Sequence, residues 1–251
     1  MLEYREDSEA ISLNPMTRKK KQGYGDAAYW EHRYQHDVVP FEWYQKYDGL
    51  RDLLKKYIHA TADILMLGCG NSALSEDMAK DGYYDITNVD ISPTVIKAMK
   101  MKHLDLPQLK WVCADARSMT IFKSGSLDAV IDKGTLDALM CGDEATENVN
   151  SMVSEVFRLL RPGGVYLMVS YGEPTTRMPY LGPSRRAWST SLHLLPRPTA
   201  AQEKYSWVRT LEPVPVGEDG ILPPHLHGKD ADFHYVYACV KEKLNVLLDG
   251  Q

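Results

Sequence analysis

Residues 63–71 read Asp-Ile-Leu-Met-Leu-Gly-Cys-Gly-Asn, and this stretch decides the fold. Its apolar part, residues 64–67, has the length of a buried parallel strand. Gly68 and Gly70 then remove two Cβ atoms where the chain turns and another group can come close. Residues 73–82 are predicted as a helix. A strand, a glycine turn and a helix form the nucleotide-binding geometry, at the sheet edge where ligands bind in open α/β folds.

Four further strands are predicted after this turn, separated by helical segments. Ser92 followed by Pro93 is typical of a helix start, with serine as the cap and proline at the first helical position. Strands that alternate with helices indicate a mostly parallel sheet with helices on both faces. The predicted strands are residues 85–90, 109–113, 127–131 and 165–169, and the predicted helices include 49–59 and 148–160.

The composition changes after residue 171. Nine of the 14 prolines lie between Pro174 and Pro224, so this stretch cannot continue the alternation. Residues 188–195 and 233–240 are rich in β-forming side chains and are predicted as two late antiparallel strands. We therefore expect an α/β fold: a Rossmann-like, doubly wound sheet of seven strands, mostly parallel, with an antiparallel pair at its C-terminal end.

The expected domain plan is a flexible tail over residues 1–22 followed by a single domain over 23–251. The tail is polar and ends in basic residues. Within the domain, residues 24–60 are expected to form a helical cap. Residues 172–232 are expected to form a proline-rich insertion on the substrate side.

The composition also limits the classes of function. Hydrophobic residues make up 44% of the 251 residues, so a disordered chain is excluded. The formal charge of −5 argues against binding nucleic acid through global charge, and no apolar run approaches the length of a membrane span. The four cysteines form no CxxC pair, so we expect reduced thiols and no metal site. The expected location is the cytoplasm, with the nucleus left open.

The expected helical cap is rich in aromatic residues. Tyr29, Trp30 and Tyr34 recur at helical spacing, and Trp43 belongs to a second group. A hydrophobic core alone does not need aromatic side chains with polar tips. Because aromatic faces attract cations, a sulfonium or ammonium ligand is one interpretation, and packing in the core is the other.

Three acidic residues follow successive predicted strands, at the same sheet edge as the glycine turn: Asp90, Asp115 and Asp132. Asp90 lies 22 residues after Gly68, near the offset of about 20 residues at which a carboxylate meets ribose hydroxyls. Asp115 could accept a hydrogen bond from an adenine amine, and Asp132 would lie near a reacting group. For each acid alone, a helix cap or solvation in a loop is the alternative.

The pattern Gly68-x-Gly70-x-x-Ala73 also fits the fingerprint of a nicotinamide dehydrogenase. Three features argue against that enzyme class. The glycine turn follows about 60 residues of aromatic-rich, helical sequence, and a second acid follows the third strand. The chain is also expected to end in an antiparallel pair of strands.

Together these motifs resemble the class I S-adenosylmethionine-dependent methyltransferases. A narrower resemblance, over roughly residues 24–172, is to the lysine methyltransferases that act on translation elongation factor 1-alpha. That subgroup includes the methyltransferase domain linked with endothelin-converting enzyme. The class resemblance rests on Leu-Gly-Cys-Gly-Asn-Ser (67–72), Val-Asp (89–90), Ala-Asp-Ala (114–116), Asp-Lys-Gly-Thr-Leu-Asp-Ala-Leu (132–139) and Leu-Arg-Pro-Gly-Gly (160–164). The narrower one rests on residues 67–75, 132–139 and the aromatic residues of 29–34.

The resemblance implies that S-adenosyl-L-methionine is the cofactor and S-adenosyl-L-homocysteine the product. Gly68 and Gly70 would approach the methionine end of the cofactor. The partner would be a protein substrate, with elongation factor 1-alpha as the candidate. The other implied contacts are Asp90 with Ile91 at the ribose, Asp115 with Ala116 at the adenine, and Trp30, Tyr34, Trp43 and Lys133 around the pocket.

A lysine acceptor must lose a proton before its amine attacks the methyl group. Lowering a pKa of about 10.4 to a working pH of about 7.4 is worth ~4 kcal/mol. We expect desolvation and the sulfonium charge to lower that pKa. Asp132 is the candidate catalytic residue, which would orient the amine or relay its proton. A purely structural Asp132 that bonds a helix start is the alternative.

Other functions are compatible with the sequence. The acceptor could be a small molecule or a protein N-terminus, because residues 172–232 would decide its identity. A non-catalytic cofactor-binding module and a nicotinamide dehydrogenase are the further alternatives. We expect a monomer that binds neither nucleic acid nor a membrane.

Overall fold

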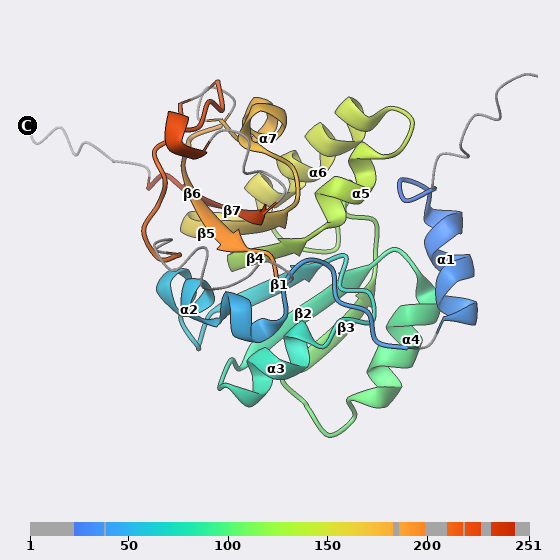
Figure 1. Cartoon of the computed structure of the whole chain (residues 1–251). Helices are drawn as coiled ribbons and strands as arrows, with labels where there is room; N and C mark the ends of the chain where they lie inside the picture. Colours follow the sequence, from blue (N-terminus) through green and yellow to red (C-terminus); the bar gives the residue numbers. More distant parts are fainter. Residues whose placement is uncertain are drawn as a thin grey trace, which may run out of the picture.

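Seven strands form one sheet in the order β3-β2-β1-β4-β5-β7-β6 (Figure 1). Strands β1 to β5 run parallel to one another, and β7 is antiparallel to both β5 and β6. This arrangement confirms the predicted fold, including the antiparallel pair. The strands are β1 (Asp63–Leu67), β2 (Asp85–Asp90), β3 (Leu109–Cys113), β4 (Leu127–Lys133), β5 (Leu160–Ser170), β6 (Trp188–Pro196) and β7 (Phe233–Lys241).

The structure is a computed structural model that describes residues 23–37, 39–182, 186–198, 210–217, 219–226 and 232–243. The tail predicted over residues 1–22 lies outside the described residues, as do parts of the insertion predicted over 172–232. The division into tail, cap and insertion therefore stays a prediction. No helix in the described ranges is both long and apolar enough to cross a membrane.

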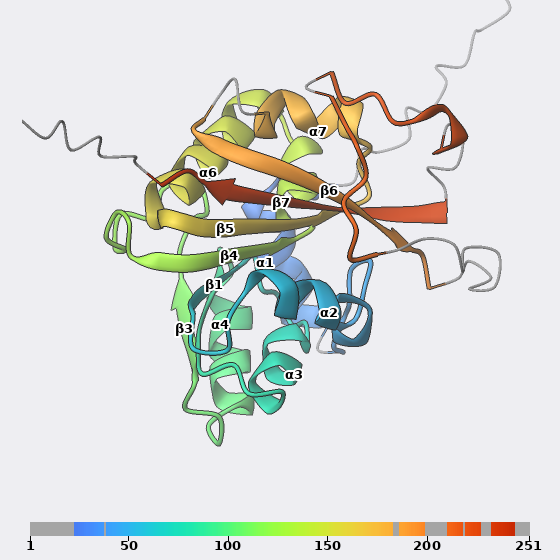
Figure 2. The same ribbon diagram turned by 90° about the vertical axis from the view of Figure 1, so that its left-hand side faces the viewer.

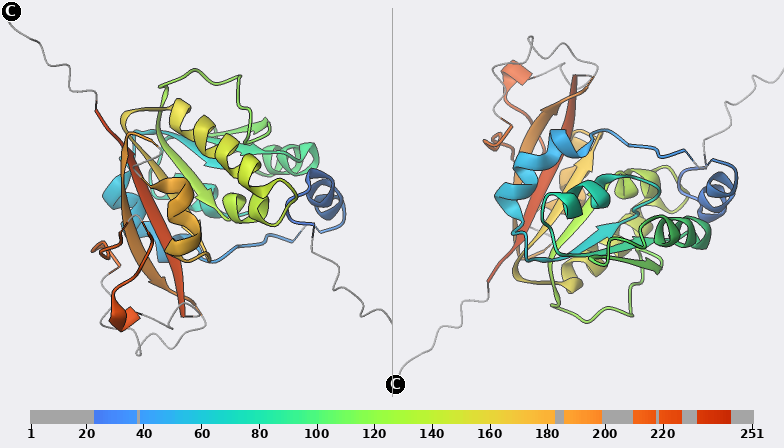
Figure 3. Two further views of the ribbon diagram at one scale, coloured as in Figure 1. Left: turned by 90° about the horizontal axis from the view of Figure 1, so that it is seen from above. Right: turned by 90° about the horizontal axis from the view of Figure 1, so that it is seen from below.

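Alternate side chains of the strands supply two hydrophobic cores, one on each face of the sheet. In β1, Ile64 and Met66 pack with α2, α3 and α4, whereas Leu65 and Leu67 pack with α5, α6 and α7. Figures 2 and 3 show the sheet between these two groups of helices. Burial on both faces accounts for the near-continuous apolar strands. The helices are α2 (Tyr47–Tyr57), α3 (Leu74–Lys80), α4 (Pro93–Lys102), α5 (Thr135–Met140), α6 (Ala145–Leu159) and α7 (Pro174–Leu181).

Helix α1 (Ala27–His36) lies beside α4, at the end of the sheet away from β6 and β7 (Figures 1 and 3). Glu31 fixes it there, because its carboxylate accepts hydrogen bonds of 2.5 Å from Ser92 Oγ and from Thr94 Oγ1. Ser92 also caps α4, as predicted. None of the described residues of α1 is buried. This helix therefore covers the domain rather than belonging to its core.

The proline-rich stretch contains a helix that the sequence pattern does not predict. Helix α7 has Pro174 in its first turn, where the missing N–H costs nothing, and Pro179 inside it. Met178 and Leu181 of this helix are buried. Their burial offsets the helix-breaking effect of Pro179. Because this stabilisation comes from tertiary packing, the local sequence pattern does not indicate the helix.

Candidate active site

A cleft opens at the carboxyl ends of β1, β2 and β4. All ten residues predicted to bind a cofactor line this cleft: Trp30, Tyr34, Trp43, Gly68, Gly70, Asp90, Ile91, Asp115, Ala116 and Lys133. The fold thus brings together residues from six separate segments of the chain. Their contacts with a ligand stay a prediction.

The glycine turn after β1 depends on both of its glycines. Gly68 and Gly70 have φ angles of +59° and +51°, which L side chains rarely adopt. A Cβ atom at Gly68 would overlap Thr135 Oγ1, and one at Gly70 would lie 2.5 Å from Tyr34 Oη. The two glycines therefore let α5 and α1 approach the turn closely.

Asp90 lines the cleft, and its carboxylate binds two backbone N–H groups. Its Oδ2 accepts a hydrogen bond of 2.8 Å from Gly70 N, and its Oδ1 accepts one of 3.0 Å from Ser92 N. The residue is 7% exposed, and this burial raises the pKa of its carboxyl group. Each carboxylate oxygen can accept a second hydrogen bond. Asp90 can therefore hold the glycine turn and still accept from a diol in the cleft.

Asp115 lies at the next strand end and is held by a neighbour in sequence. Its carboxylate forms an ion pair of 2.7 Å with Arg117 Nη2 and accepts a hydrogen bond of 2.8 Å from Arg117 N. Burial raises the pKa of Asp115, but the hydrogen bonds from Arg117 outweigh this effect and leave the pKa below its usual value. Part of the hydrogen-bonding capacity of Asp115 is thus already used.

Aromatic side chains cover the cleft from α1 and from the segment that follows it. Trp30 stacks between Tyr24 and Tyr34, with ring centroids 5.8 Å and 6.0 Å away. The Trp43 ring meets Trp30 edge-on at 6.4 Å. The Arg33 guanidinium lies 5.6 Å from the Trp30 centroid. Trp30, Tyr34 and Trp43 line the cleft, and Tyr34 also packs against the hydrophobic core. That these rings bind a cationic ligand stays a prediction.

Glu42 is a residue of this site that sequence reasoning missed. Its carboxylate accepts hydrogen bonds of 2.8 Å from Lys133 Nζ and 2.6 Å from Ala73 N, and Ser72 Oγ donates to both of its oxygens. Ala73, the N-cap residue of α3, has no side-chain hydrogen-bond acceptor. The Glu42 carboxylate supplies a negatively charged acceptor at this helix start instead. Burial lowers the pKa of Lys133, although Glu42 partly opposes this. The one available signal was an acid between two aromatic residues.

Asp132, the candidate catalytic residue, is fully buried beneath the cleft. Its carboxylate accepts hydrogen bonds of 2.7 Å from Thr135 N, 3.2 Å from Leu136 N and 2.8 Å from Tyr166 Oη. It is not among the described residues that line the cleft. These contacts are those of the structural alternative, a strand-end acid that bonds a helix start. A catalytic role for Asp132 stays a prediction, and it would have to act through α5.

The environment of Asp132 predicts an unusual dependence of stability on pH. Burial raises its pKa to about 6 from an ordinary value near 3.8. Between these values the folded state binds a proton that the unfolded state releases, so this group's contribution to stability falls as pH rises. We expect wild type to lose about 2 kcal/mol relative to Asp132→Asn between pH 4 and pH 7. Urea unfolding of both proteins across this range tests it, and a constant difference would contradict the assignment.

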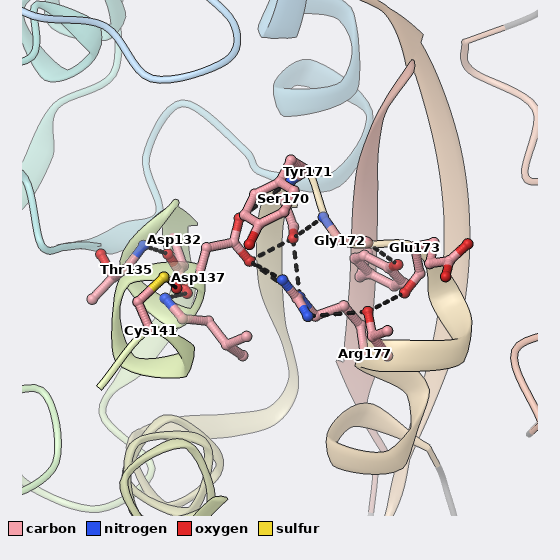
Figure 4. Close-up of polar contacts among 12 residues, drawn as sticks. Asp132, Thr135, Asp137, Cys141, Ser170, Tyr171, Gly172, Glu173 and Arg177 are labelled. Carbon is pink, nitrogen blue, oxygen red and sulfur yellow. Dashed lines mark hydrogen bonds and ion pairs between the residues drawn. The ribbon is translucent and has the colours of Figure 1, made fainter. Parts of the chain in front are cut away.

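Asp137, in the first turn of α5, is the centre of a second buried polar group that the sequence did not reveal. Its carboxylate pairs with Arg177 Nη2 at 2.7 Å, and both side chains are 4% exposed. Figure 4 shows these two residues between α5, the end of β5 and α7, together with Ser170, Tyr171 and Gly172. The group lies next to the cleft, because Ala138, the following residue, is part of the cleft lining.

Comparison with known sequences gives relatives of one kind. Residues 65–168 match the family described as a methyltransferase domain. EEF1A lysine methyltransferase 4 from Bos taurus is 37% identical over 185 residues, which cover 70% of this chain and 72% of that protein. The eEF1A lysine and N-terminal methyltransferase from Homo sapiens is 38% identical over 180 residues, which cover 70% of this chain but 26% of that longer protein.

Solved structures share the fold. Phosphoethanolamine N-methyltransferase 1 from Haemonchus contortus, in complex with phosphoethanolamine and S-adenosylhomocysteine, has a TM-score of 0.55 and 12% identity over 87% of this chain and 48% of its own. The [4+2]-cyclase SpnF has a TM-score of 0.53 and 16% identity over 88% and 94%. At these identities the fold alone is shared, and the family follows from the sequence relatives. This chain belongs to the S-adenosylmethionine-dependent methyltransferases, in the family that includes EEF1A lysine methyltransferase 4.

Proposed function

We propose that this enzyme transfers a methyl group from S-adenosylmethionine to a lysine side chain of translation elongation factor 1A. The observation that carries the proposal is the single cleft lined by all ten predicted residues, with Asp90 and the glycine turn at its floor. The choice of substrate is supported by the names of relatives that are 37% and 38% identical.

The residues of the cleft fit the cofactor. Asp90 offers two carboxylate oxygens to the ribose diol, and Asp115 with Ala116 lies one strand further along, where the adenine would be held. The glycine turn leaves room for the methionine part, and the rings of Trp30 and Trp43 suit a sulfonium cation. When bound, the cofactor supplies the electrophilic methyl group, and the protein aligns the acceptor and excludes water.

The acceptor nitrogen must arrive without its proton. Desolvation beside a cation lowers the pKa of an amine, and a covered cleft provides that environment. Asp132 contacts the N–H groups at the start of α5 rather than the cleft. We therefore assign Asp132 a positioning role, in which it fixes the turn from Lys133 to Thr135 that forms one wall of the cleft.

Transfer of a labelled methyl group tests the proposal directly. The purified enzyme is incubated with methyl-labelled S-adenosylmethionine and elongation factor 1A that lacks prior methylation, and the labelled residue is identified by mass spectrometry. We expect the label on a lysine. Label confined to small molecules, or cofactor binding in calorimetry without transfer to any protein, would contradict the proposal.

A protein N-terminus is the second candidate acceptor. It is favoured by relatives named eEF1A lysine and N-terminal methyltransferase, of which this chain covers 26%. An α-amino group, with a pKa of about 7.7–8.0, is easier to deprotonate than a lysine. Elongation factor with a blocked N-terminus distinguishes the candidates, because only lysine methylation survives the block. A cytoplasmic location and a monomeric state accord with such a substrate and stay predictions.

A further inference from the structure

The acceptor must reach the cleft from a side that α1 leaves accessible. Helix α1 lies over the β2 and β3 side of the sheet, where Glu31 holds it to α4. On the other side, Lys133 and Gly134 after β4 form the wall of the cleft. Strand β5 is the next neighbour of β4, so the residues that follow β5 lie beside that wall, outside the described lining of the cleft.

Asp137 is the centre of a group of residues next to this wall, which meets the cleft lining where Tyr44 lies against Gly134. Its Oδ2 accepts a hydrogen bond of 2.7 Å from Tyr44 Oη and one of 3.2 Å from Tyr171 N. Its Oδ1 accepts one of 2.6 Å from Ser170 Oγ and forms the ion pair with Arg177. One buried carboxylate thus ties together the segment before α2, the end of β5 and α7 (Figure 4).

Tyr44 is held in a conformation that a free chain would avoid. Its φ angle is +64°, an uncommon value for a bulky side chain. The bond to Asp137 fixes the hydroxyl, and the ring edge lies against Gly134, where an added Cβ would come 3.2 Å from Tyr44 Cε2. Strained residues of this kind persist where surrounding contacts hold them, and they cluster at ligand-binding sites.

Tyr171 is an exposed aromatic residue whose backbone is nevertheless fixed. Tyr171 is 48% exposed, so burial in a hydrophobic core does not account for an aromatic residue at this position. Its ring centroid lies 6.1 Å from that of Tyr44, and the Arg177 guanidinium lies 5.6 Å from the Tyr171 centroid. Because Asp137 neutralises Arg177, this cation supports the ring without repelling a second cation strongly.

We propose that Tyr171 and Tyr44 form the aromatic entrance through which the acceptor lysine side chain reaches the cleft, and that Asp137 positions both rings. The proposal rests on the lysine acceptor of the proposed function. The methylene groups of a lysine pack well on aromatic faces, and its ammonium group is attracted to them before it loses its proton. Tyr171 contacts the substrate in this arrangement, whereas Asp137 is a positioning residue.

Four variants test the entrance. Tyr171→Ala removes the exposed ring, and Tyr171→Phe retains its face. Tyr44→Phe removes only the hydroxyl that Asp137 holds. Tyr84→Ala is the matched control, because Tyr84 is 77% exposed and precedes β2 at the opposite edge of the sheet. For each protein, kcat and KM for the acceptor are measured at saturating cofactor, with the Kd for S-adenosylhomocysteine and the Tm.

For Tyr171→Ala we expect the acceptor KM to rise about tenfold, while the Kd for S-adenosylhomocysteine and the Tm stay those of wild type. Tyr171→Phe should restore the KM, and Tyr84→Ala should match wild type. Tyr44→Phe should lower kcat/KM for the acceptor about fivefold, because the ring is retained but its position is no longer fixed by Asp137. The Kd for S-adenosylhomocysteine should stay that of wild type.

An acceptor KM for Tyr171→Ala within twofold of wild type would overturn the proposal. So would a loss of S-adenosylhomocysteine affinity as large as the rise in acceptor KM, because the ring would then serve the cofactor. The proposed function fails differently, since the wild type itself would then methylate no lysine. Methylation that is restricted to acceptors without a cationic amine would overturn both.

Discussion

Asp90→Asn is expected to weaken the binding of S-adenosylmethionine at least about 100-fold, or about 3 kcal/mol. In wild type, N–H groups of Gly70 and Ser92 point at the two carboxylate oxygens. An asparagine keeps one oxygen and turns a donor toward the other N–H group, so the glycine turn loses an anchor. The ribose diol also loses a charged acceptor, and hydrogen bonds to charged groups contribute about 1.5–3 kcal/mol each.

The same substitution at Asp115 is the matched comparison, measured by calorimetry with S-adenosylhomocysteine. Asp115 is already paired with Arg117 and its side chain is 34% exposed, so Asp115→Asn should weaken binding less than about tenfold. Retention of circular dichroism and Tm by Asp90→Asn separates loss of the ligand from loss of the fold. Equal effects of the two substitutions, or tight binding by Asp90→Asn, would show that Asp90 does not hold the cofactor.

Asp137→Ala is expected to lower the free energy of unfolding by about 3–5 kcal/mol. The substitution leaves the Arg177 guanidinium buried without its carboxylate and removes the acceptor for Tyr44 Oη, Ser170 Oγ and Tyr171 N. A buried charge without a partner is among the most destabilising changes that a single substitution produces. Urea unfolding followed by circular dichroism measures the loss.

Arg177→Met provides the control for this prediction. It removes the cation but leaves Asp137 with three hydrogen-bond donors, and the methionine fills the buried space with an apolar chain of similar length. Arg177→Met should therefore cost less stability than Asp137→Ala. If Arg177→Met is the more destabilising of the two, the carboxylate is not the centre of the group.

The positions of β1 and β4 could be predicted because each contains a short apolar run that ends at a polar turn, whereas β5 begins at Leu160, before its predicted start at residue 165. The ranges predicted for β2 and β3 agree with the structure to the residue. The common edge of Asp90 and Asp115 followed from the parallel order of those strands, without any knowledge of side chains. Helix α7 was missed because its stability comes from burying Met178 and Leu181, which local propensity does not register.

The pairings inside the site could not be read from the sequence. Glu42 and Lys133 are 91 residues apart, and no periodic pattern links them. Asp132 and Asp137 belong to the same short motif, and both are buried. Which groups each acid contacts depends on where α5 begins: Asp132 precedes its first N–H groups, whereas Asp137 lies one turn later and faces β5 and α7. The different contacts of the two acids can be identified only from the three-dimensional structure.

The strand order separates the strands that come early in the chain from those that come late. The strands β1, β2 and β3, which come early in the chain, carry the glycine turn, Asp90 and Asp115. The chain crosses to the other side of β1 at β4, and the strands that follow β5, namely β6 and β7, lie beyond β5 in the sheet. The family match ends at residue 168, close to this boundary. Under the proposed function, the late segments and the acceptor that they select can be exchanged while the half proposed to hold the methyl donor stays intact.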